Sequence, residues 1–109
     1  MPFDDRLAER VRTRLGKLDG VSEKKMFAGL AFLLHGNMCC GVHKRELIVR
    51  LDADRTEAAL AQPHTRIFDL SGRPMKGWIL VGPAGLEDEK ALAKWVRMAV
   101  DYAASLPRK

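Results

Sequence analysis

The sequence has few cysteines and no long apolar run, and both absences narrow the kind of protein it encodes. Its two cysteines, Cys39 and Cys40, are adjacent. They cannot form a framework of bridges across a fold, and a reducing compartment keeps both as thiols. No apolar segment approaches the roughly 20 residues that span a bilayer, and the start, MPFDDRLAER, lacks the basic and then apolar stretch of a signal peptide. We therefore expect a cytoplasmic protein that does not contact a membrane.

The motifs of several enzyme classes are also missing. The chain contains no G-x-x-x-x-G-K-[ST], G-x-G-x-x-G or G-x-S-x-G segment. His35, Cys39 and His43 are spaced by four, but a turn at Gly36-Asn37 separates the first from the others. Along one strand, Cys39 and His43 would lie roughly 13 Å apart, too far for one zinc ion. The leading expectation is therefore no enzyme, no metal site and no cofactor.

Basic residues outnumber acidic ones, 19 to 14, and give a formal net charge of +5. Binding to phosphate backbones needs such charge gathered on one face. The excess lies mostly between residues 23 and 51, where five Lys and Arg face two Glu. These five residues carry the alternative hypothesis of nucleic-acid binding: Lys24, Lys25, Lys44, Arg45 and Arg50.

Length and periodicity predict a single domain over residues 1–109. With 47% hydrophobic and 30% charged residues, the chain can form one core without metal or disulfide bonds. Apolar residues at a spacing of three or four predict an N-terminal helix from near Asp4 to before Gly20. The same spacing predicts a C-terminal helix that is capped by Asp88 and lasts almost to the end of the chain.

Between these helices the pattern changes to short apolar segments separated by turn signals. The stretch from Lys24 to Leu51 predicts three antiparallel strands. A short helix is expected from Asp54, as its cap, to Gln62, and RIFDL and WILV then predict two more strands. The expected fold class is α+β in two layers. Its antiparallel sheet is a central three-stranded meander plus a further hairpin, with N-terminal, middle and C-terminal helices packed on it.

The facing of the meander follows from its turns, because residues directly opposite in an antiparallel pair point to the same side. Two-residue turns at His35-Gly36 or Gly36-Asn37, and at Lys44-Arg45, divide the side chains into two sets. The predicted core set is Phe27, Gly29, Ala31, Leu33, Met38, Cys40, Val42, Leu47, Val49 and Leu51. The opposite set is Leu30, Phe32, Leu34, Cys39, Gly41, His43, Glu46, Ile48 and Arg50.

The opposite set is unusual for a free sheet face, because large apolar residues line up on its first strand. Something is expected to cover them: one of the protein's own helices, a second copy of the chain, or a ligand in a groove. A neighbouring Arg50 would favour the thiolate of Cys39, whereas Cys40 belongs to the core. The candidate interaction surface consists of Leu30, Phe32, Leu34, Cys39, His43, Ile48 and Arg50.

A second candidate site is the loop 71–78, which joins the last two expected strands. It combines two glycines, two cations and a tryptophan in eight residues. Glycines let the backbone approach a ligand, and Arg73 and Lys76 could hold an anion beside Trp78. The other interpretation is a hairpin connection whose tryptophan covers the edge of the core. Together with Cys39, the loop supports a third hypothesis, a small-ligand binder or a thiol-dependent enzyme.

Four segments resemble the TfoX N-terminal domain family, and the likeness spans nearly the entire chain. Ala28 stands where the family's Met-Phe-Gly-Gly signature has its first glycine, and Trp95-Val96 of the last helix also fits. The four segments are Met26-Phe27-Ala28-Gly29-Leu30-Ala31-Phe32, Gly36-Asn37-Met38, Glu46-Leu47-Ile48-Val49-Arg50-Leu51 and Gly72-Arg73-Pro74-Met75-Lys76-Gly77-Trp78.

This resemblance implies a two-layer α+β domain of regulatory ancestry, because the family's founding members are regulators of natural competence that act with the transcription machinery. Those regulators carry a second, C-terminal domain, for which this chain is expected to have no room, so competence regulation is not carried over. The resemblance brings no catalytic residues. The leading hypothesis is a non-enzymatic regulatory or protein-interaction module, whose partner is another protein or a second copy of itself.

Overall fold

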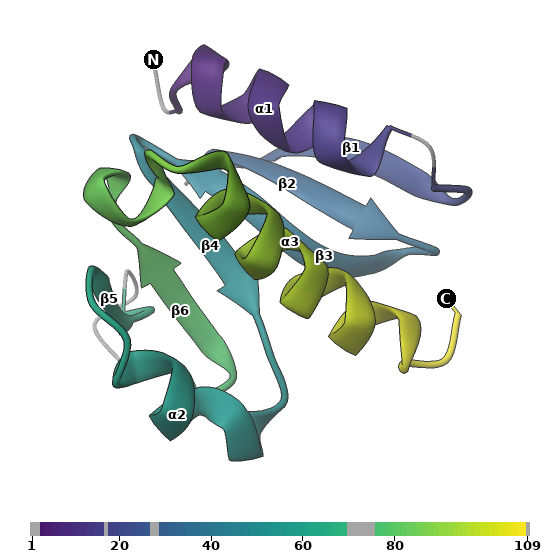
Figure 1. The fold of residues 1–109 in the computed structure, drawn as a ribbon. Coiled ribbons are helices and arrows are strands. Elements are labelled where there is room, and N and C mark those ends of the chain that lie inside the picture. The colour runs from purple at the N-terminus through teal and green to yellow at the C-terminus, as the bar shows by residue number, and fades with distance from the viewer. Residues whose placement is uncertain (1–2, 17, 27–28, 70–75, 109) are drawn as a thin grey trace.

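The computed structural model describes residues 3–16, 18–26, 29–69 and 76–108. Within these residues, six antiparallel strands form one sheet in the order β1-β2-β3-β4-β6-β5 (Figure 1). The strands are β1 (Val21–Met26), β2 (Gly29–Leu34), β3 (Asn37–His43), β4 (Glu46–Arg50), β5 (Thr65–Ile67) and β6 (Trp78–Val81). The helices are α1 (Asp5–Leu15), α2 (Thr56–Leu60) and α3 (Glu89–Ala104), with two 3₁₀ turns, η1 (Ala53–Arg55) and η2 (Pro83–Leu86).

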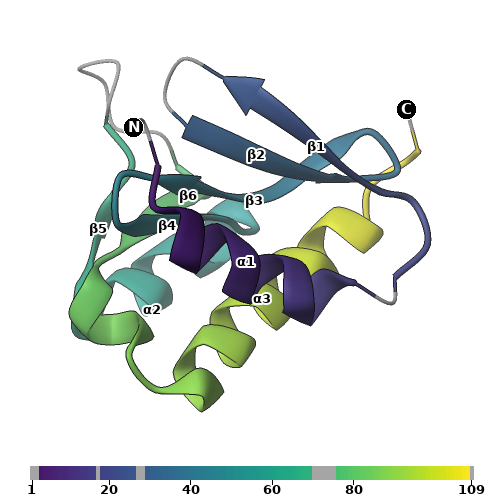
Figure 2. The same cartoon turned by 90° about the horizontal axis from the view of Figure 1, so that it is seen from above.

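The helices α1, α2 and α3 all pack on one face of the sheet (Figures 1 and 2). Helix α3 lies across β2, β3 and β4, α1 lies beside α3, and α2 packs against β5 and β6. The predicted two-layer α+β class is therefore confirmed. The last two strands also pair as a hairpin, and β6 pairs with β4 as well, so the hairpin and the meander form one continuous sheet.

Capping aspartates begin the two long helices where the sequence predicts. The Asp4 carboxylate accepts hydrogen bonds from the backbone N–H groups of Arg6 (2.8 Å) and Leu7 (3.3 Å). Asp88 accepts a hydrogen bond from the N–H of Lys90 (3.0 Å) at the start of α3. Each cap satisfies donors that the first turn of a helix leaves without a partner.

The middle helix differs from its prediction. Asp52, and not Asp54, supplies the cap, because the segment opens with the tight turn η1 and the Asp52 carboxylate accepts from the N–H two residues on (2.9 Å). Helix α2 then ends at Leu60. Its first residue, the buried Thr56, accepts a hydrogen bond from the N–H of Gly77 (2.8 Å), which ties α2 to the start of β6.

The meander has four strands where the sequence predicts three. The apolar stretch from Lys24 to Leu34 was expected to be one strand, but it is divided between β1 and β2, which pair antiparallel. Gly29 permits this arrangement, because its φ is +145° and a Cβ there would lie 2.0 Å from the carbonyl oxygen of Val42. Strand β1 is an edge strand with exposed charged side chains, which disfavour pairing with another chain.

A β-bulge in β3 reverses the facing that the turns predict for β2. Close to the turn, Leu33 lies opposite Met38, as a two-residue turn requires. One step farther, Phe32 lies opposite Cys40, so Cys39 is an extra residue on β3. A bulge places two residues of one strand opposite one residue of its neighbour. Beyond the bulge the pairing is shifted by one residue, so Phe32 and Leu30 lie opposite Cys40 and Val42 and share their core face.

The core lies between the sheet and the helices. The prediction that Leu30, Phe32 and Leu34 face away from the core is wrong, because all three are buried in it, whereas Ala31 and Leu33 point to the other side. On the sheet, the core also contains Cys39, Cys40, Val42, Leu47, Val49, Leu51, Ile79 and Val81. Helices α1 and α3 contribute Leu7, Val11, Leu15, Leu92, Trp95, Val96, Ala99 and Ala103.

Candidate interaction site

Most of the predicted interaction surface is not a surface. Leu30, Phe32 and Leu34 are buried in the core between sheet and helices, so the protein's own helices cover them. Among the three coverings considered, the first is therefore the one observed. These residues are unable to contact a partner while the fold is intact.

The two cysteines do not have the opposite facings that the turns predict. Because Cys39 occupies the bulge, both it and Cys40 lie in the core, with 1% and 0% of their surfaces exposed. Both are free thiols. The hydrogen bond between its thiol and that of Cys39, together with burial, raises the pKa of Cys40 well above its ordinary value. The neutral thiol of Cys40 is therefore favoured, and the burial of Cys39 leaves the hypothesis of Cys39-based chemistry without an accessible nucleophile.

The remaining members of the predicted surface separate from one another. Ile48 is on the sheet face away from the helices, where it is nevertheless buried in a row with Ala31 and Leu80. His43 is half-buried at the end of β3, opposite Glu46. Arg50 lies at the other end of β4, and it is there that the structure brings sequence-predicted residues together.

Arg50 is held between two aromatic rings. Its guanidinium carbon lies 5.2 Å from the ring centroid of Trp78 and 5.5 Å from that of Tyr102, within the range of cation–π attraction. The Arg50 Nη1 atom also donates a hydrogen bond to the carbonyl oxygen of Met38 (3.3 Å). All three side chains are half-buried. We call Arg50, Trp78 and Tyr102 the aromatic–arginine cluster.

The strand register builds this cluster. Arg50 and Trp78 are direct partners on β4 and β6. The turn before Trp78 is fixed by Gly77, whose φ is +86° and whose carbonyl oxygen accepts a hydrogen bond from the N–H of Leu51 (2.6 Å). The ring of Phe68 also lies close to Trp78, with 6.0 Å between the two ring centroids. Two segments far apart in the sequence therefore place an arginine and a tryptophan side by side.

Sequence reasoning missed Tyr102, the third member of the cluster. Its position in the apolar stripe of the last helix assigned it to the core, yet it lies near the end of α3 and remains partly exposed. A signal was present, since the tyrosine hydroxyl is polar, and such side chains favour the boundary between core and water.

A cleft of about 200 Å³ adjoins the cluster at Tyr102. Its walls come from the residues after β4 and from the last turns of α3. They combine aliphatic groups with two carboxylates and one guanidinium: Leu51, Asp52, Arg55, Met98, Asp101, Tyr102 and Ser105. The cleft is therefore of mixed character, with one net negative charge.

The predicted anion-binding loop is described only in part. Arg73 lies outside the described residues. Lys76 is exposed in the turn before β6, and Trp78 turns toward Arg50. The tryptophan thus belongs to the aromatic–arginine cluster.

The comparison with protein families decides the relationship of the chain. The model of the TfoX N-terminal domain matches residues 13–103. The chain belongs to the TfoX N-terminal domain family. The resemblance inferred from the four sequence segments is thus confirmed, and this family is not known as enzymatic. No curated protein and no solved structure matches the chain.

The matched part of the TfoX-family domain includes every member of the aromatic–arginine cluster. Among the described residues, no group of three His, Cys, Asp or Glu side chains could hold a metal ion. Within the same ranges, no helix is long and apolar enough to cross a membrane.

The cations proposed for nucleic-acid binding are dispersed in this TfoX-family domain. Lys24 and Lys25 are neighbours on β1 and therefore alternate between the two sheet faces. The turn after β3 carries Lys44 and Arg45, and Arg45 is 4.0 Å from the carboxylate of Asp4. Arg50 is at the opposite end of β4 from that turn. The five cations do not converge on one stripe.

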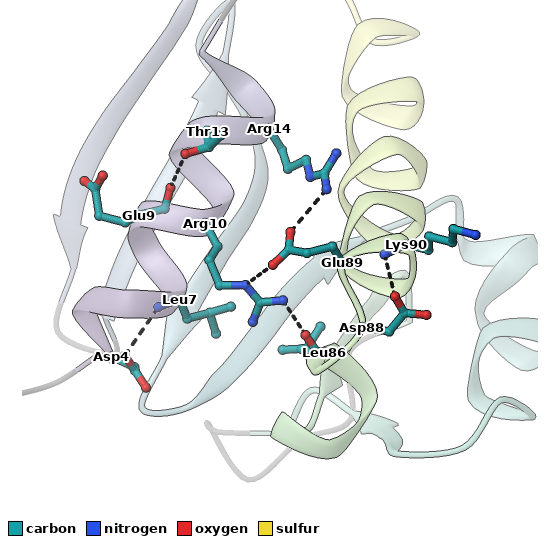
Figure 3. Close-up of polar contacts among 10 residues, drawn as sticks. All are labelled: Asp4, Leu7, Glu9, Arg10, Thr13, Arg14, Leu86, Asp88, Glu89 and Lys90. Carbon is teal, nitrogen blue, oxygen red and sulfur yellow. Dashed lines mark hydrogen bonds and ion pairs between the residues drawn. The ribbon is translucent and has the colours of Figure 1, made fainter.

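A second arginine cluster ties α1 to the start of α3 (Figure 3). Arg10 donates one hydrogen bond to the Glu89 carboxylate (2.6 Å) and another to the carbonyl oxygen of Leu86 (2.6 Å). Arg14 also reaches Glu89 (3.2 Å). The hydrogen bonds from Arg10 and Arg14 hold the pKa of Glu89 below its ordinary value. In this second cluster the arginines form ion pairs with a carboxylate, whereas Arg50 forms no ion pair with a described residue.

Proposed function

We propose that this TfoX-family domain is a non-enzymatic regulatory module that binds another protein through the aromatic–arginine cluster. The observation that carries the proposal is the grouping of Arg50, Trp78 and Tyr102 at the surface. Arginine, tryptophan and tyrosine are the residues enriched at the energetic centres of protein interfaces. Their mutual contacts restrict their rotamers before binding, which lowers the entropic cost of association.

We place the domain in the cytoplasm, where Cys39 and Cys40 stay reduced. The partner is a second protein or another copy of the chain. The dispersal of the cations makes nucleic acid the weaker alternative, because phosphate backbones are bound by charge gathered along one face.

Site-directed photo-crosslinking in cells tests the proposed surface. A photoreactive phenylalanine analogue replaces Tyr102 in one variant and Arg97 in a matched control, since Arg97 is on the same helix with its side chain 84% exposed. We expect covalent protein adducts from position 102 and few from position 97. Adduct masses distinguish a dimer from a heterologous complex. Equal adducts at both positions, or none at 102, would contradict the proposed surface.

Titration of labelled DNA and RNA at low salt tests the alternative. We expect no saturable binding by the domain. Binding that weakens steeply as salt is added would instead favour a nucleic-acid function, because counterion release gives that dependence. Substitution of Lys24 and Lys25 by Gln would then identify the phosphate contacts.

A further inference from the structure

Arg50 carries a charge that no described residue neutralises. Its partners among the described residues are two aromatic rings and one carbonyl oxygen. No carboxylate among residues 3–16, 18–26, 29–69 and 76–108 forms an ion pair with it. Four other arginines each contact a carboxylate within 4 Å: Arg10, Arg12, Arg14 and Arg66. Within the described part of the chain, Arg6, Arg55 and Arg108 also form no ion pair, but none of them has the aromatic contacts of Arg50.

We propose that Arg50 recognises a carboxylate on the protein partner, an inference that rests on the proposed function. A guanidinium has five N–H donors in a planar fork that matches the two oxygens of a carboxylate. One of these donors is used by Met38. Bonds between a guanidinium and a carboxylate are among the stronger hydrogen bonds in proteins.

The surroundings of Arg50 prepare it for this role. The rings of Trp78 and Tyr102 hold the guanidinium in place, so less side-chain entropy is lost when a ligand binds. Partial burial also lowers the local dielectric constant, which strengthens a charge-assisted hydrogen bond compared with one in water. An arginine that extends freely into solvent has neither advantage.

The neighbouring cleft distinguishes a protein carboxylate from a nucleic-acid backbone. Asp52, Asp101 and Arg55 line the cleft beside Tyr102 and leave it with one net negative charge. This charge disfavours a chain of several phosphates more than it disfavours a single carboxylate on Arg50. Leu51 and Met98 give the same cleft an aliphatic wall, which suits an apolar side chain next to the acidic one. The partner segment is therefore expected to contain an acidic residue beside an aliphatic residue.

A pair of short peptides tests this inference on the intact domain. The probe is acetyl-Glu-Leu-amide, and the control is acetyl-Gln-Leu-amide, which has the same shape without the charge. Binding is followed by nuclear magnetic resonance from the side-chain N–H signals of Arg50 and Trp78. The Arg45 signal is the internal control, because that side chain is 78% exposed and has no aromatic partner among the described residues.

We expect saturable shifts of Arg50 and Trp78 with the Glu peptide, and affinity for the Gln peptide weaker by about tenfold. Arg45 should respond little to either. Arg50→Lys keeps the charge but lacks the planar fork, so it should lose most of the preference for Glu over Gln. Equal responses to both peptides, or equal shifts of Arg45 and Arg50, would overturn the inference.

Two further arms separate the possible failures. In the first arm, inorganic phosphate or a DNA duplex competes with the Glu peptide. If either displaces the peptide and binds more tightly, the ligand of Arg50 is a phosphate and not a carboxylate. In the second arm, the peptide result is compared with the crosslinking result. If the domain does not prefer the Glu peptide but still forms crosslinks at position 102, carboxylate recognition is rejected and the interaction surface is retained. If the domain prefers the Glu peptide but forms no crosslinks, the proposed protein-binding function is rejected and Arg50 remains a carboxylate-binding site.

Discussion

Two arginines near opposite ends of helix α3 occupy different surroundings. Arg10, a residue of α1, lies next to the start of α3, where it contacts the Glu89 carboxylate and the Leu86 carbonyl (Figure 3). Arg50 lies near its end, between Trp78 and Tyr102, and among the described residues its polar partner is a carbonyl oxygen. Both connect the helix to other elements, but only Arg10 is neutralised by a charge of opposite sign.

This difference separates a structural contact from a recognition contact. The ion pair of Arg10 is complete within the chain, so it contributes to stability and offers little to a partner. The Arg50 guanidinium is positioned by its neighbours while its charge remains available. Removing Arg10 should therefore weaken the fold, whereas removing Arg50 should weaken binding.

The largest change in stability is expected from a substitution of Trp95, which lies midway along α3 between these two arginines. This residue is 2% exposed in the core under α3, so Trp95→Ala should lower the free energy of unfolding by about 3–5 kcal/mol. Arg97→Ala, on the exposed side of the helix, should change it by less than about 0.5 kcal/mol. Urea denaturation measures both. A loss below about 1 kcal/mol for Trp95→Ala would mean that the terminal arginines, and not core packing, hold the helix.

The next effect compares the two arginines directly through Arg10→Met and Arg50→Met. Methionine keeps most of the aliphatic stem and removes the guanidinium. We expect Arg50→Met to weaken binding of the Glu peptide by about tenfold, with a stability loss of about 0.5–1 kcal/mol from the lost cation–π contacts. Arg10→Met should leave peptide binding unchanged and lower stability by about 1 kcal/mol through its lost bond to the Leu86 carbonyl.

Denaturation and the peptide titration, applied to both variants, give four measurements. The comparison fails if the pattern is inverted, with Arg10→Met affecting the peptide and Arg50→Met affecting stability alone. It is sharpened if each variant changes one quantity and leaves the other at the wild-type value.

A smaller effect concerns the pH dependence of the Arg10 contact. Since the folded protein holds the pKa of Glu89 below its ordinary value, the folded state binds its proton less tightly than the unfolded state. The stabilisation is thus complete above the ordinary carboxyl pKa of about 4.3 and is lost as pH falls through the lowered pKa. The stability difference between wild type and Glu89→Gln should shrink from pH 7 toward pH 3.

Urea denaturation at several pH values measures that difference. Glu23, whose pKa is lowered by the hydrogen bond from Arg12, titrates in the same direction in both proteins and cancels in the comparison. A difference that stays constant over this range would show that the contact of Glu89 with Arg10 and Arg14 does not depend on its charge.

The fold class could be predicted from the sequence, because periodicity and capping are local properties. Asp4 and Asp88 each begin a helix where a carboxylate precedes an apolar stripe. The hairpin of β5 and β6 also follows from local signals. The aromatic–arginine cluster could not be predicted, since Arg50 meets Trp78 only through a strand register and meets Tyr102 only through the packing of α3.

The facing of β2 could not be predicted for a different reason. The strand pairing expected from the turn between β2 and β3 is correct for Leu33 and Met38, which lie close to that turn. One extra residue, Cys39, then shifts every pair beyond it by one position and so changes the side on which the β2 residues lie. Nothing in the residue types indicates the bulge. A single backbone irregularity therefore moved Leu30 and Phe32 from a proposed interaction surface into the core.

The smallest effect of the arginine substitutions is expected on the alkylation rates of the two thiols, which lie on β3, a strand that α3 crosses. Because Cys39 and Cys40 are both buried in the core, alkylation by iodoacetamide near neutral pH should be slow and nearly equal at the two sites, and should require opening of the fold. Arg10→Met, by costing about 1 kcal/mol, should accelerate both by about fivefold, and Arg50→Met by less. Mass spectrometry of the labelled peptides measures each rate, with the urea-unfolded chain as the reference for full reactivity. Selective, rapid labelling of Cys39 in the native protein would show that the bulge leaves this thiol accessible, and it would restore thiol chemistry as a function for the domain.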